Sequence, residues 1–214
     1  MVIKKYMIEP LVIALSKGRI LLKSLSLLKK AGIIPIDSIE NNRKLLFNTK
    51  KKYLNLIFLR AIDVPTYVKL GAADMGIVGK DVLLENGSKG LYEPIDFQIS
   101  KCRLMTAGLI GFNVKNKTRK VATKFLNIAK KYYASKGIKA DIIKLYGAME
   151  LAPLMNLADE IIDIVDTGNT LKENGMEPKT LITNISTRLI VNKTSMIIKY
   201  KYINPLIELL ISII

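Results

Sequence analysis

The chain has 214 residues, of which 50% are hydrophobic and 24% charged, a composition that excludes an intrinsically disordered protein. One cysteine and no histidine exclude an internal disulfide bond, the usual Cys/His zinc sites and histidine-based acid/base catalysis. The net charge of +16 favours a polyanionic partner, namely a nucleic acid, an anionic membrane or a phosphorylated small molecule, although a composition rich in Lys, Ile and Asn would produce the same excess without any partner.

The first part of the chain alternates short apolar runs with segments of helical spacing. Because strands separated by helices are typical of parallel sheets, this order predicts an α/β unit whose strands end at one common edge. The predicted strands are 11–15, 54–59 and 75–78, and the predicted helices are 20–30, 63–70 and 82–85, with Asp81 expected to cap the last one.

The alternation breaks after residue 91, where two expected strands, 92–97 and 103–107, follow each other without a helix. We interpret this break as the point where the chain crosses between two lobes. A second alternating set then begins, with expected strands at 120–123, 141–144 and 161–165 and expected helices at 125–135 and 148–157.

The long strand-like run 180–191 is expected to return the chain to the first lobe. We therefore predict a two-lobed α/β protein with lobe I formed by 1–98 and 182–214 and lobe II by 99–181. Since ligands of such sheets bind beyond the carboxyl ends of the strands, a ligand cleft is expected between the lobes.

The loop after strand 161–165 has the composition of a phosphate site. Gly168 allows backbone N–H groups to approach an anion, and its neighbours Thr167, Asn169 and Thr170 supply side-chain donors at the start of a helix. The alternative is that Asp166 or Thr167 only caps this helix. The loop is not a P-loop, because the chain contains no GxxxxGK[ST] motif.

Cations follow two of the predicted strands of lobe I. Lys17, Gly18 and Arg19 come after the first strand, and Arg60 comes directly after the second, where a guanidinium could clamp a diphosphate. The alternatives are a solvated helix start for the first group and a salt bridge to Asp63 for Arg60. Arg43 lies in a polar loop, and its spacing alone favours an ordinary surface position.

Three further features have weaker signals. Glu150 and Asp163 are carboxylates that could accept hydrogen bonds from sugar hydroxyls, and Asp163 stands inside an apolar strand, where an unpaired charge is rare. The glycines of segment 71–81, Gly79 among them, fit either a ligand or close packing of helix on strand. Cys102 is interpreted as a packing residue, because no histidine is present to activate it.

The two ends of the chain suggest no membrane attachment. The N-terminal stretch has only a five-residue apolar run and no small-residue cleavage site, so a cytoplasmic location is expected. The apolar end, 205–214, is about half the ~20 residues that a membrane span needs. It is expected to form a helix or a contact surface.

Six blocks, in this order, resemble the short form of the ATP phosphoribosyltransferase catalytic subunit of histidine biosynthesis. The blocks are ALSKGR (14–19), RKLLF (43–47), DVPTYVKLGAADMGIVGKDVLLE (63–85), KLYGAMELAPL (144–154), DIVDTGNTLKENG (163–175) and ISTRLIVN (185–192). The resemblance runs over nearly the whole chain. It implies a two-lobed fold like that of type II periplasmic binding proteins.

The resemblance also implies the reaction and its cofactor. N1 of the adenine of ATP would displace pyrophosphate from C1 of phosphoribosyl pyrophosphate, giving phosphoribosyl-ATP. Mg²⁺ would be carried mainly by substrate phosphates and waters. Short-form subunits of this family use a regulatory chain that resembles histidyl-tRNA synthetase, so a homodimer within a hetero-oligomer is expected.

Site residues carried over from the resemblance fall into three groups. Arg60 would contact the leaving diphosphate, with Lys17 and Arg43 as its helpers. The 5-phosphate would lie in the loop 166–170, and Asp163 and Glu150 are candidates for the ribose hydroxyls. Gly18, Arg19 and Gly79 are further candidates for ATP or the diphosphate.

Two other classes of function remain as alternatives. A non-catalytic two-lobed module could bind a phosphosugar or nucleotide without turning it over. A nucleic-acid binder would explain the positive charge, but the sequence contains no recognised module or aromatic stacking pattern for it, so neither nucleic acid nor membrane is expected as a partner.

Overall fold

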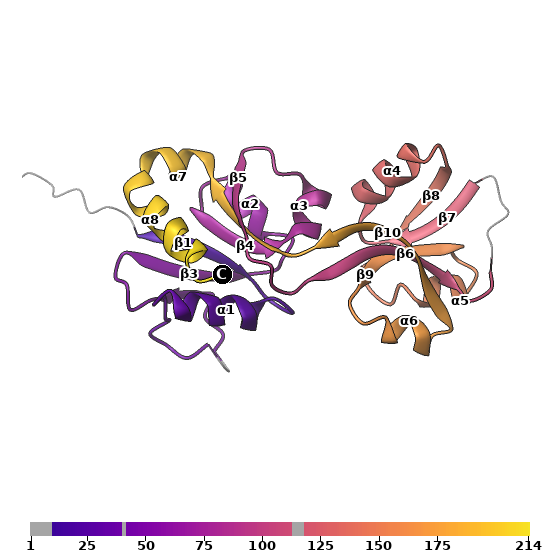
Figure 1. Cartoon of the computed structure of the whole chain (residues 1–214), viewed down its shortest axis with the longest axis horizontal. Helices are drawn as coiled ribbons and strands as arrows, with labels where there is room; N and C mark the ends of the chain where they lie inside the picture. The colour runs from indigo at the N-terminus through magenta and orange to yellow at the C-terminus, as the bar shows by residue number, and fades with distance from the viewer. Residues whose placement is uncertain (1–9, 40–41, 113–117) are drawn as a thin grey trace, which may run out of the picture. The chain divides into compact units, whose positions relative to one another are not determined.

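The computed structural model describes residues 10–39, 42–112 and 118–214, which form two compact α/β units (Figure 1). Unit 1 comprises Met1–Leu83, Ser88–Ser100 and Thr187–Ile214, and unit 2 comprises Leu84–Gly87 and Lys101–Ser186. The two main crossings lie after Ser100 and after Ser186, a few residues beyond the expected boundaries at 98 and 181. No helix of the described residues is long and apolar enough to span a membrane.

Unit 1 is built on a six-stranded sheet with the order β2-β3-β1-β4-β11-β5. Strands β1, β3 and β4 are parallel, whereas β2, β11 and β5 each run antiparallel to a neighbour. The strands are β1 (Leu11–Ser16), β2 (Leu46–Asn48), β3 (Leu54–Leu59), β4 (Met75–Gly79), β5 (Leu91–Asp96) and β11 (Thr187–Asn192). The helices are α1 (Leu21–Lys30), α2 (Val64–Lys69), α3 (Lys80–Asn86), α7 (Lys193–Ile198) and α8 (Tyr200–Ile211).

The sheet of unit 1 is buried on both faces, which is why its central strands read as continuous apolar runs. Alternate residues of one strand enter different core clusters: Ile13 packs with residues of α1 and α8, and Ala14 packs with residues of α2 and α3. The C-terminal apolar run expected as a helix or contact surface is part of α8, and it contributes Leu206 and Leu210 to the first of these clusters.

Unit 2 is built on a five-stranded sheet with the order β10-β6-β9-β7-β8, in which β7, β8 and β9 are parallel and β6 is antiparallel to both its neighbours. The strands are β6 (Cys102–Leu109), β7 (Thr118–Thr123), β8 (Lys139–Lys144), β9 (Glu160–Val165) and β10 (Met176–Ile185). The helices are α4 (Leu126–Ser135), α5 (Leu151–Leu154) and α6 (Asn169–Glu173).

Most predicted strands and helices are confirmed, with three corrections. The strand-like run 180–191 is interrupted at Ser186, so its first part belongs to β10 of unit 2 and its second part to β11 of unit 1. The helix expected over 148–157 is only α5, because Ala148 and Asn156 have φ of 49° and 55° and cannot continue a right-handed helix. Asp81 is not the cap expected for α3, since this helix already begins at Lys80 and Asp81 lies in its first turn. Strand β2 and helix α7 were not predicted.

Candidate active site

The parallel strands of unit 1 bring two predicted cations to one sheet edge. β1 pairs with β3 so that Ser16 is opposite Leu59, and the Lys17 N–H donates to the Leu59 carbonyl at 2.8 Å. Lys17 and Arg60 therefore follow neighbouring strands at the same edge, and both are exposed. In the sheet β1 lies between β3 and β4, so the strand order reverses at β1. Ligands of such sheets commonly bind beyond the carboxyl ends of the strands at this point.

Arg60 does not form the salt bridge to Asp63 that was the alternative to a diphosphate contact. The two residues are linked through the backbone, where the Asp63 N–H donates to the Arg60 carbonyl at 3.0 Å. In the described part of the chain no carboxylate lies within ion-pair distance of the Arg60 guanidinium. Its charge is therefore available to an anionic ligand.

Gly18 and Arg19 lie in the turn that joins β1 to α1. Gly18 has φ of 96°, a conformation that side chains other than glycine rarely adopt, while the space beside it is open. Backbone geometry therefore explains the glycine here. Arg19 is exposed next to it, at the same end of β1 as Lys17.

Arg43 also belongs to this sheet edge. Because β2 is antiparallel to β3, the segment that leads into β2 lies beside the carboxyl end of β3, as shown by the 2.9 Å hydrogen bond from Phe58 N–H to the Leu45 carbonyl. Arg43 is exposed, and its neighbour Lys44 pairs with Asp37 at 2.7 Å. The structure thus places Arg43 nearer the other cations than its loop position suggested.

Packing explains two glycines of the segment 71–81. A Cβ at Gly76 would lie 2.8 Å from side-chain atoms of both Val64 and Val68, so α2 can pack on β4 only without it. A Cβ at Gly79 would collide with the Asp81 carboxylate. Gly79 ends β4 at the edge that carries the cations, so its predicted contact with ATP or diphosphate stays a prediction.

Unit 2 gathers six of the predicted residues around one cavity of about 150 Å³ at the carboxyl end of β9. This cavity is lined by both polar and apolar residues, and the apolar ones include Ala107, Ile161 and Leu171. The predicted residues that line it are Glu150, Asp163, Asp166, Thr167, Gly168 and Thr170. Asn169, also predicted, begins α6 and is exposed.

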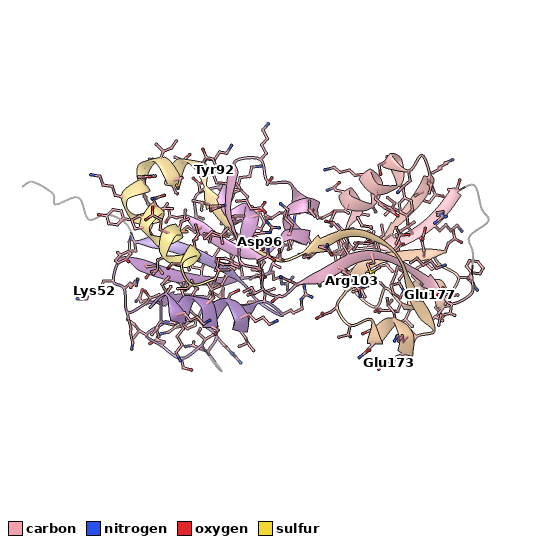
Figure 2. The ribbon with its side chains drawn as sticks, in the orientation of Figure 1. Lys52, Tyr92, Asp96, Arg103, Glu173 and Glu177 are labelled. Carbon is pink, nitrogen blue, oxygen red and sulfur yellow. The ribbon has the colours of Figure 1, made fainter. Side chains whose placement is uncertain are left out.

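The loop before α6 shows the capping contact that the sequence left open, and its role as a phosphate site stays a prediction. Thr167 Oγ1 accepts a hydrogen bond from the Asn169 N–H at 3.4 Å, so this hydroxyl supports the start of the helix. Gly168 has φ of 84° and faces open space, with its nearest neighbour 3.8 Å from an added Cβ. Since α6 has only five residues, ending at Glu173 (Figure 2), loop donors rather than a helix dipole favour an anion here.

Asp163 has a partner that the sequence analysis missed. Its Oδ1 lies 3.1 Å from Lys124 Nζ and also accepts the Ile164 N–H at 2.8 Å, which explains how a carboxylate is tolerated in a largely buried strand. Glu150 precedes α5, and its carboxylate forms no hydrogen bond or ion pair with other residues that the structure describes. Of the three carboxylates that line the cavity, Glu150, Asp163 and Asp166, Asp163 is thus the one anchored by an ion pair to a described residue.

A buried ionic cluster lies at the other end of β9. Glu160, 2% exposed, accepts from Arg119 at 2.8 Å and from the Tyr133 hydroxyl at 2.9 Å. Burial, and then the charge of Glu160, raise the pKa of the Tyr133 phenol far above its ordinary value, and the hydrogen bond to Glu160 raises the pKa of Arg119. Glu160 begins the strand that ends at the cavity, so this cluster stabilises unit 2 away from the site.

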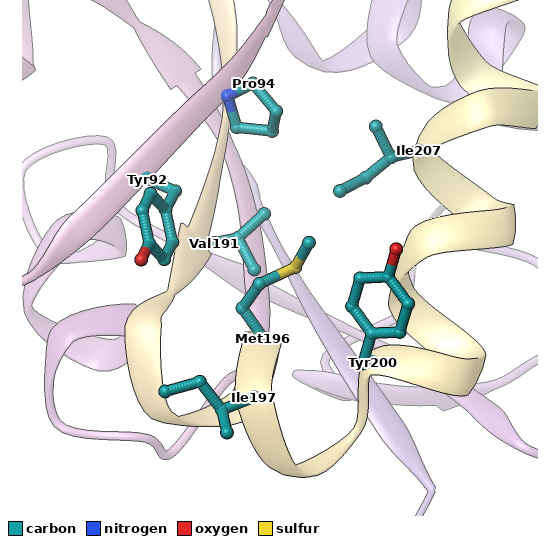
Figure 3. A pocket seen from close by; sticks show the side chains of 7 residues that line it. All are labelled: Tyr92, Pro94, Val191, Met196, Ile197, Tyr200 and Ile207. Atoms are coloured by element: carbon teal, nitrogen blue, oxygen red, sulfur yellow. The ribbon is translucent and has the colours of Figure 1, made fainter.

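A cavity of about 650 Å³ in unit 1 is apolar and has no charged side chain in its lining. Figure 3 shows these side chains on β5, β11, α7 and α8: Tyr92, Pro94, Val191, Met196, Ile197, Tyr200 and Ile207. Because charge on phosphates needs donors or cations, this cavity does not fit a phosphorylated substrate.

In residues 10–39, 42–112 and 118–214 no group of three His, Cys, Asp or Glu side chains is arranged to hold a metal ion. The carboxylates of the unit 2 cavity are oxygen donors of the type Mg²⁺ prefers, which fits an ion that takes most of its other ligands from a substrate.

Comparisons with known proteins give a consistent result. The family model described as ATP phosphoribosyltransferase matches residues 60–212. ATP phosphoribosyltransferases of Chromohalobacter salexigens and Marinobacter nauticus are 60% and 58% identical over 202 residues, covering 94% of each chain in both cases. A solved ATP phosphoribosyl transferase (HisG:HisZ) complex from Thermotoga maritima contains a chain 37% identical to this one, with a TM-score of 0.83 and coverage of 95% of this chain and 98% of that one.

More distant structures share only the fold. The substrate-binding protein of an amino acid ABC transporter is 13% identical, with a TM-score of 0.56 and coverage of 95% of this chain and 90% of the other. This likeness agrees with the expected periplasmic-binding-protein-like architecture.

Proposed function

The chain belongs to the ATP phosphoribosyltransferase family, and on this premise we propose how its residues transfer a phosphoribosyl group to ATP. The bond from adenine N1 to C1 of the sugar forms while the bond from C1 to the diphosphate oxygen breaks, and the electron pair leaves with the diphosphate. N1 already carries a lone pair, so the chain needs no histidine base. Catalysis then depends on positioning and on stabilising charge on the leaving group.

Unit 2 binds the phosphoribosyl group in this proposal. The loop formed by Asp166, Thr167, Gly168, Asn169 and Thr170 takes the 5-phosphate, with Gly168 allowing close approach of backbone N–H groups. The ribose hydroxyls donate to the carboxylates of Asp163 and Glu150, which line the same cavity. The observation that carries the proposal is that residues of the predicted loop 166–170 and the separately predicted Glu150 and Asp163 line one cavity.

Cations of unit 1 act on the diphosphate. Arg60 has a guanidinium without a carboxylate partner in the described chain, and a planar fork suits two diphosphate oxygens. Lys17 and Arg43 add charge at the same sheet edge. Gly18, Arg19 and Gly79, at the ends of β1 and β4, complete the proposed contacts to ATP or diphosphate.

Mg²⁺ is proposed to enter with the substrate phosphates. When bound, it supplies shielding of the diphosphate charge, and Glu150, Asp163 and Asp166 are the side chains available to it in the cavity. The chain's own residues hold the sugar and its phosphate in place and add cations at the diphosphate.

A second kind of chain is proposed as the regulatory partner. The Thermotoga maritima neighbour is a complex of two proteins, and a subunit resembling histidyl-tRNA synthetase would bind a homodimer of this chain. Exposed apolar residues of α8, Ile211 among them, are candidates for one of these contacts.

The test is an absorbance assay for phosphoribosyl-ATP with ATP, phosphoribosyl pyrophosphate and Mg²⁺, run with and without the regulatory chain. Product that requires both substrates supports the enzyme. Tight binding of phosphoribosyl pyrophosphate with no product under either condition would instead support a non-catalytic binding module. Omitting each substrate in turn supplies the control.

A further inference from the structure

Lys124 is a cation that neither the motifs nor the proposed mechanism uses; it is outside the lining of the unit 2 cavity but pairs with Asp163, which lines it. It directly follows β7, and β7 is the parallel neighbour of β9 in the sheet. Because parallel strands end at the same edge, Lys124 lies beside the carboxyl end of β9, where its Nζ is 3.1 Å from Asp163 Oδ1. The pair therefore connects two strands at the wall of the cavity.

The two carboxylate oxygens of Asp163 differ in their partners. Oδ1 accepts the Ile164 N–H and forms the ion pair with the Lys124 ammonium group, whereas Oδ2 has no partner among the described residues. Asp163 also lines the cavity. One oxygen is thus held by the protein, and the other remains able to accept from a ligand hydroxyl.

The backbone around Lys124 is fixed on both sides. Thr123 Oγ1 donates to the Ile162 carbonyl of β9 at 2.7 Å and accepts the Phe125 N–H at 3.0 Å. The next turn is held by Glu85 of the stretch 84–87, whose carboxylate accepts the Asn127 N–H at 3.0 Å and the Ile128 N–H at 3.1 Å. The Lys124 ammonium group itself also lies 5.0 Å from the centroid of the Phe125 ring, a second contact that favours the orientation in which it pairs with Asp163.

We propose that Lys124 is a positioning residue for the phosphoribosyl group, which holds Asp163 by Oδ1 so that Oδ2 accepts a hydrogen bond from a ribose hydroxyl. The inference rests on the proposed function, because it takes Asp163 as a ribose ligand. Lys124 acts through Asp163 and not on the substrate. Its side chain is 40% exposed, so the ion pair itself contributes little to the stability of the fold.

The experiment compares Lys124→Met, Lys124→Arg, Asp163→Asn and the double variant Lys124→Met/Asp163→Asn, with the full chain and its regulatory partner. Lys120→Met is the matched control, because Lys120 is an exposed lysine of β7, the strand that Lys124 follows, and Asp163 pairs with Lys124 instead. Kinetic constants for both substrates are measured, and the affinity for phosphoribosyl pyrophosphate is measured separately by calorimetry.

Lys124→Met is expected to raise the KM and the dissociation constant for phosphoribosyl pyrophosphate roughly tenfold, within the range of coupling between contacting residues. The kcat and the KM for ATP stay within about twofold of the wild type, and Lys124→Arg restores most of the affinity. In the Asp163→Asn background, loss of Lys124 has little further effect. Lys120→Met behaves like the wild type.

Three results would overturn the inference while leaving the proposed function intact: unchanged affinity in Lys124→Met, higher affinity in that variant, or an equally large loss in the Asp163→Asn background. The last would mean that Lys124 contacts the substrate directly. A wild-type protein that neither binds phosphoribosyl pyrophosphate nor forms product would instead overturn the proposed function, and the inference with it.

Discussion

Replacing Gly168 by alanine separates the loop's binding role from its structural role. Gly168 has φ of 84°, and an added Cβ would lie 3.8 Å from Val165 Cγ1, an ordinary contact. The cost is therefore backbone strain, about 1–2 kcal/mol for a non-glycine residue in this region. Lower entropy of the unfolded chain offsets about 0.4–1 kcal/mol, which leaves a net loss of roughly 1 kcal/mol.

Gly175→Ala is a matched control at the other end of α6. Gly175 has φ of 65° with no atom within 4 Å of an added Cβ, so it carries a similar strain, but it does not line the cavity. Both variants are expected to lower Tm by about 2–4 °C, the shift for roughly 1 kcal/mol in a chain of this size. Only Gly168→Ala changes the proposed phosphate loop, 166–170.

Calorimetric titration with phosphoribosyl pyrophosphate distinguishes the two variants. Gly168→Ala is expected to bind at least about tenfold more weakly, equal to roughly 1.4 kcal/mol, because a methyl group then occupies the surface that backbone N–H groups need for the 5-phosphate. Gly175→Ala is expected to bind like the wild type. Equal losses of affinity in both variants, or normal binding by Gly168→Ala, would refute the loop assignment.

Three further substitutions test the catalytic, binding and stability arguments. Arg60→Ala should lower kcat by about 10²–10³, the usual cost of one lost electrostatic donor, and an unchanged kcat would remove Arg60 from the diphosphate site. Thr170→Val should raise the KM for phosphoribosyl pyrophosphate, and an effect confined to the KM for ATP would contradict its place in the loop. Burial raises the pKa of the Tyr133 phenol, so above pH ~10 the unfolded chain loses a phenolic proton that the folded chain keeps, and stability falls as pH rises. Urea unfolding at several pH values measures the free energy of unfolding of the wild type and of Tyr133→Phe. Above pH ~10 the difference between the two should shrink by up to about 1.4 kcal/mol per pH unit. A difference that stays constant would contradict a buried, protonated phenol.

The central parallel strands were predictable because their signal is local. Strands β1, β3, β4 and β9 are largely buried on both faces, so each is a mostly apolar run followed by small or polar residues. The residues that directly follow these strands are candidate ligand-binding residues by position alone, because ligands bind beyond the carboxyl ends of the strands. Lys17, Arg60 and Asp166 were found in this way.

Features that depend on distant partners were not predictable. The edge strand β2 has only three residues, and it exists because Leu46 pairs with Ile57. The Lys124–Asp163 pair requires the register of β7 on β9, which joins residues 39 positions apart in the sequence. A single sequence contains no record of that pairing, so Asp163 looked like an unpaired charge.

The register of β9 also decides which face of the sheet carries the site. Ile161 and Val165 belong to the core cluster that includes Ala152 of α5 and Leu171 of α6, whereas Ile162 packs with Ala129 and Tyr133 of α4. Asp163 alternates with Ile162 and therefore lies on the face of α5 and α6, where Glu150 and Gly168 line the cavity.

A slip of one residue would put Asp163 on the apolar α4 face and an isoleucine in its place at the cavity. The hydrogen bond from Thr123 Oγ1 to the Ile162 carbonyl joins the two strands next to Asp163 and opposes such a slip. Loss of this hydroxyl would therefore affect the orientation of Asp163 through the strand pairing, although Thr123 itself is fully buried and lies outside the cavity lining.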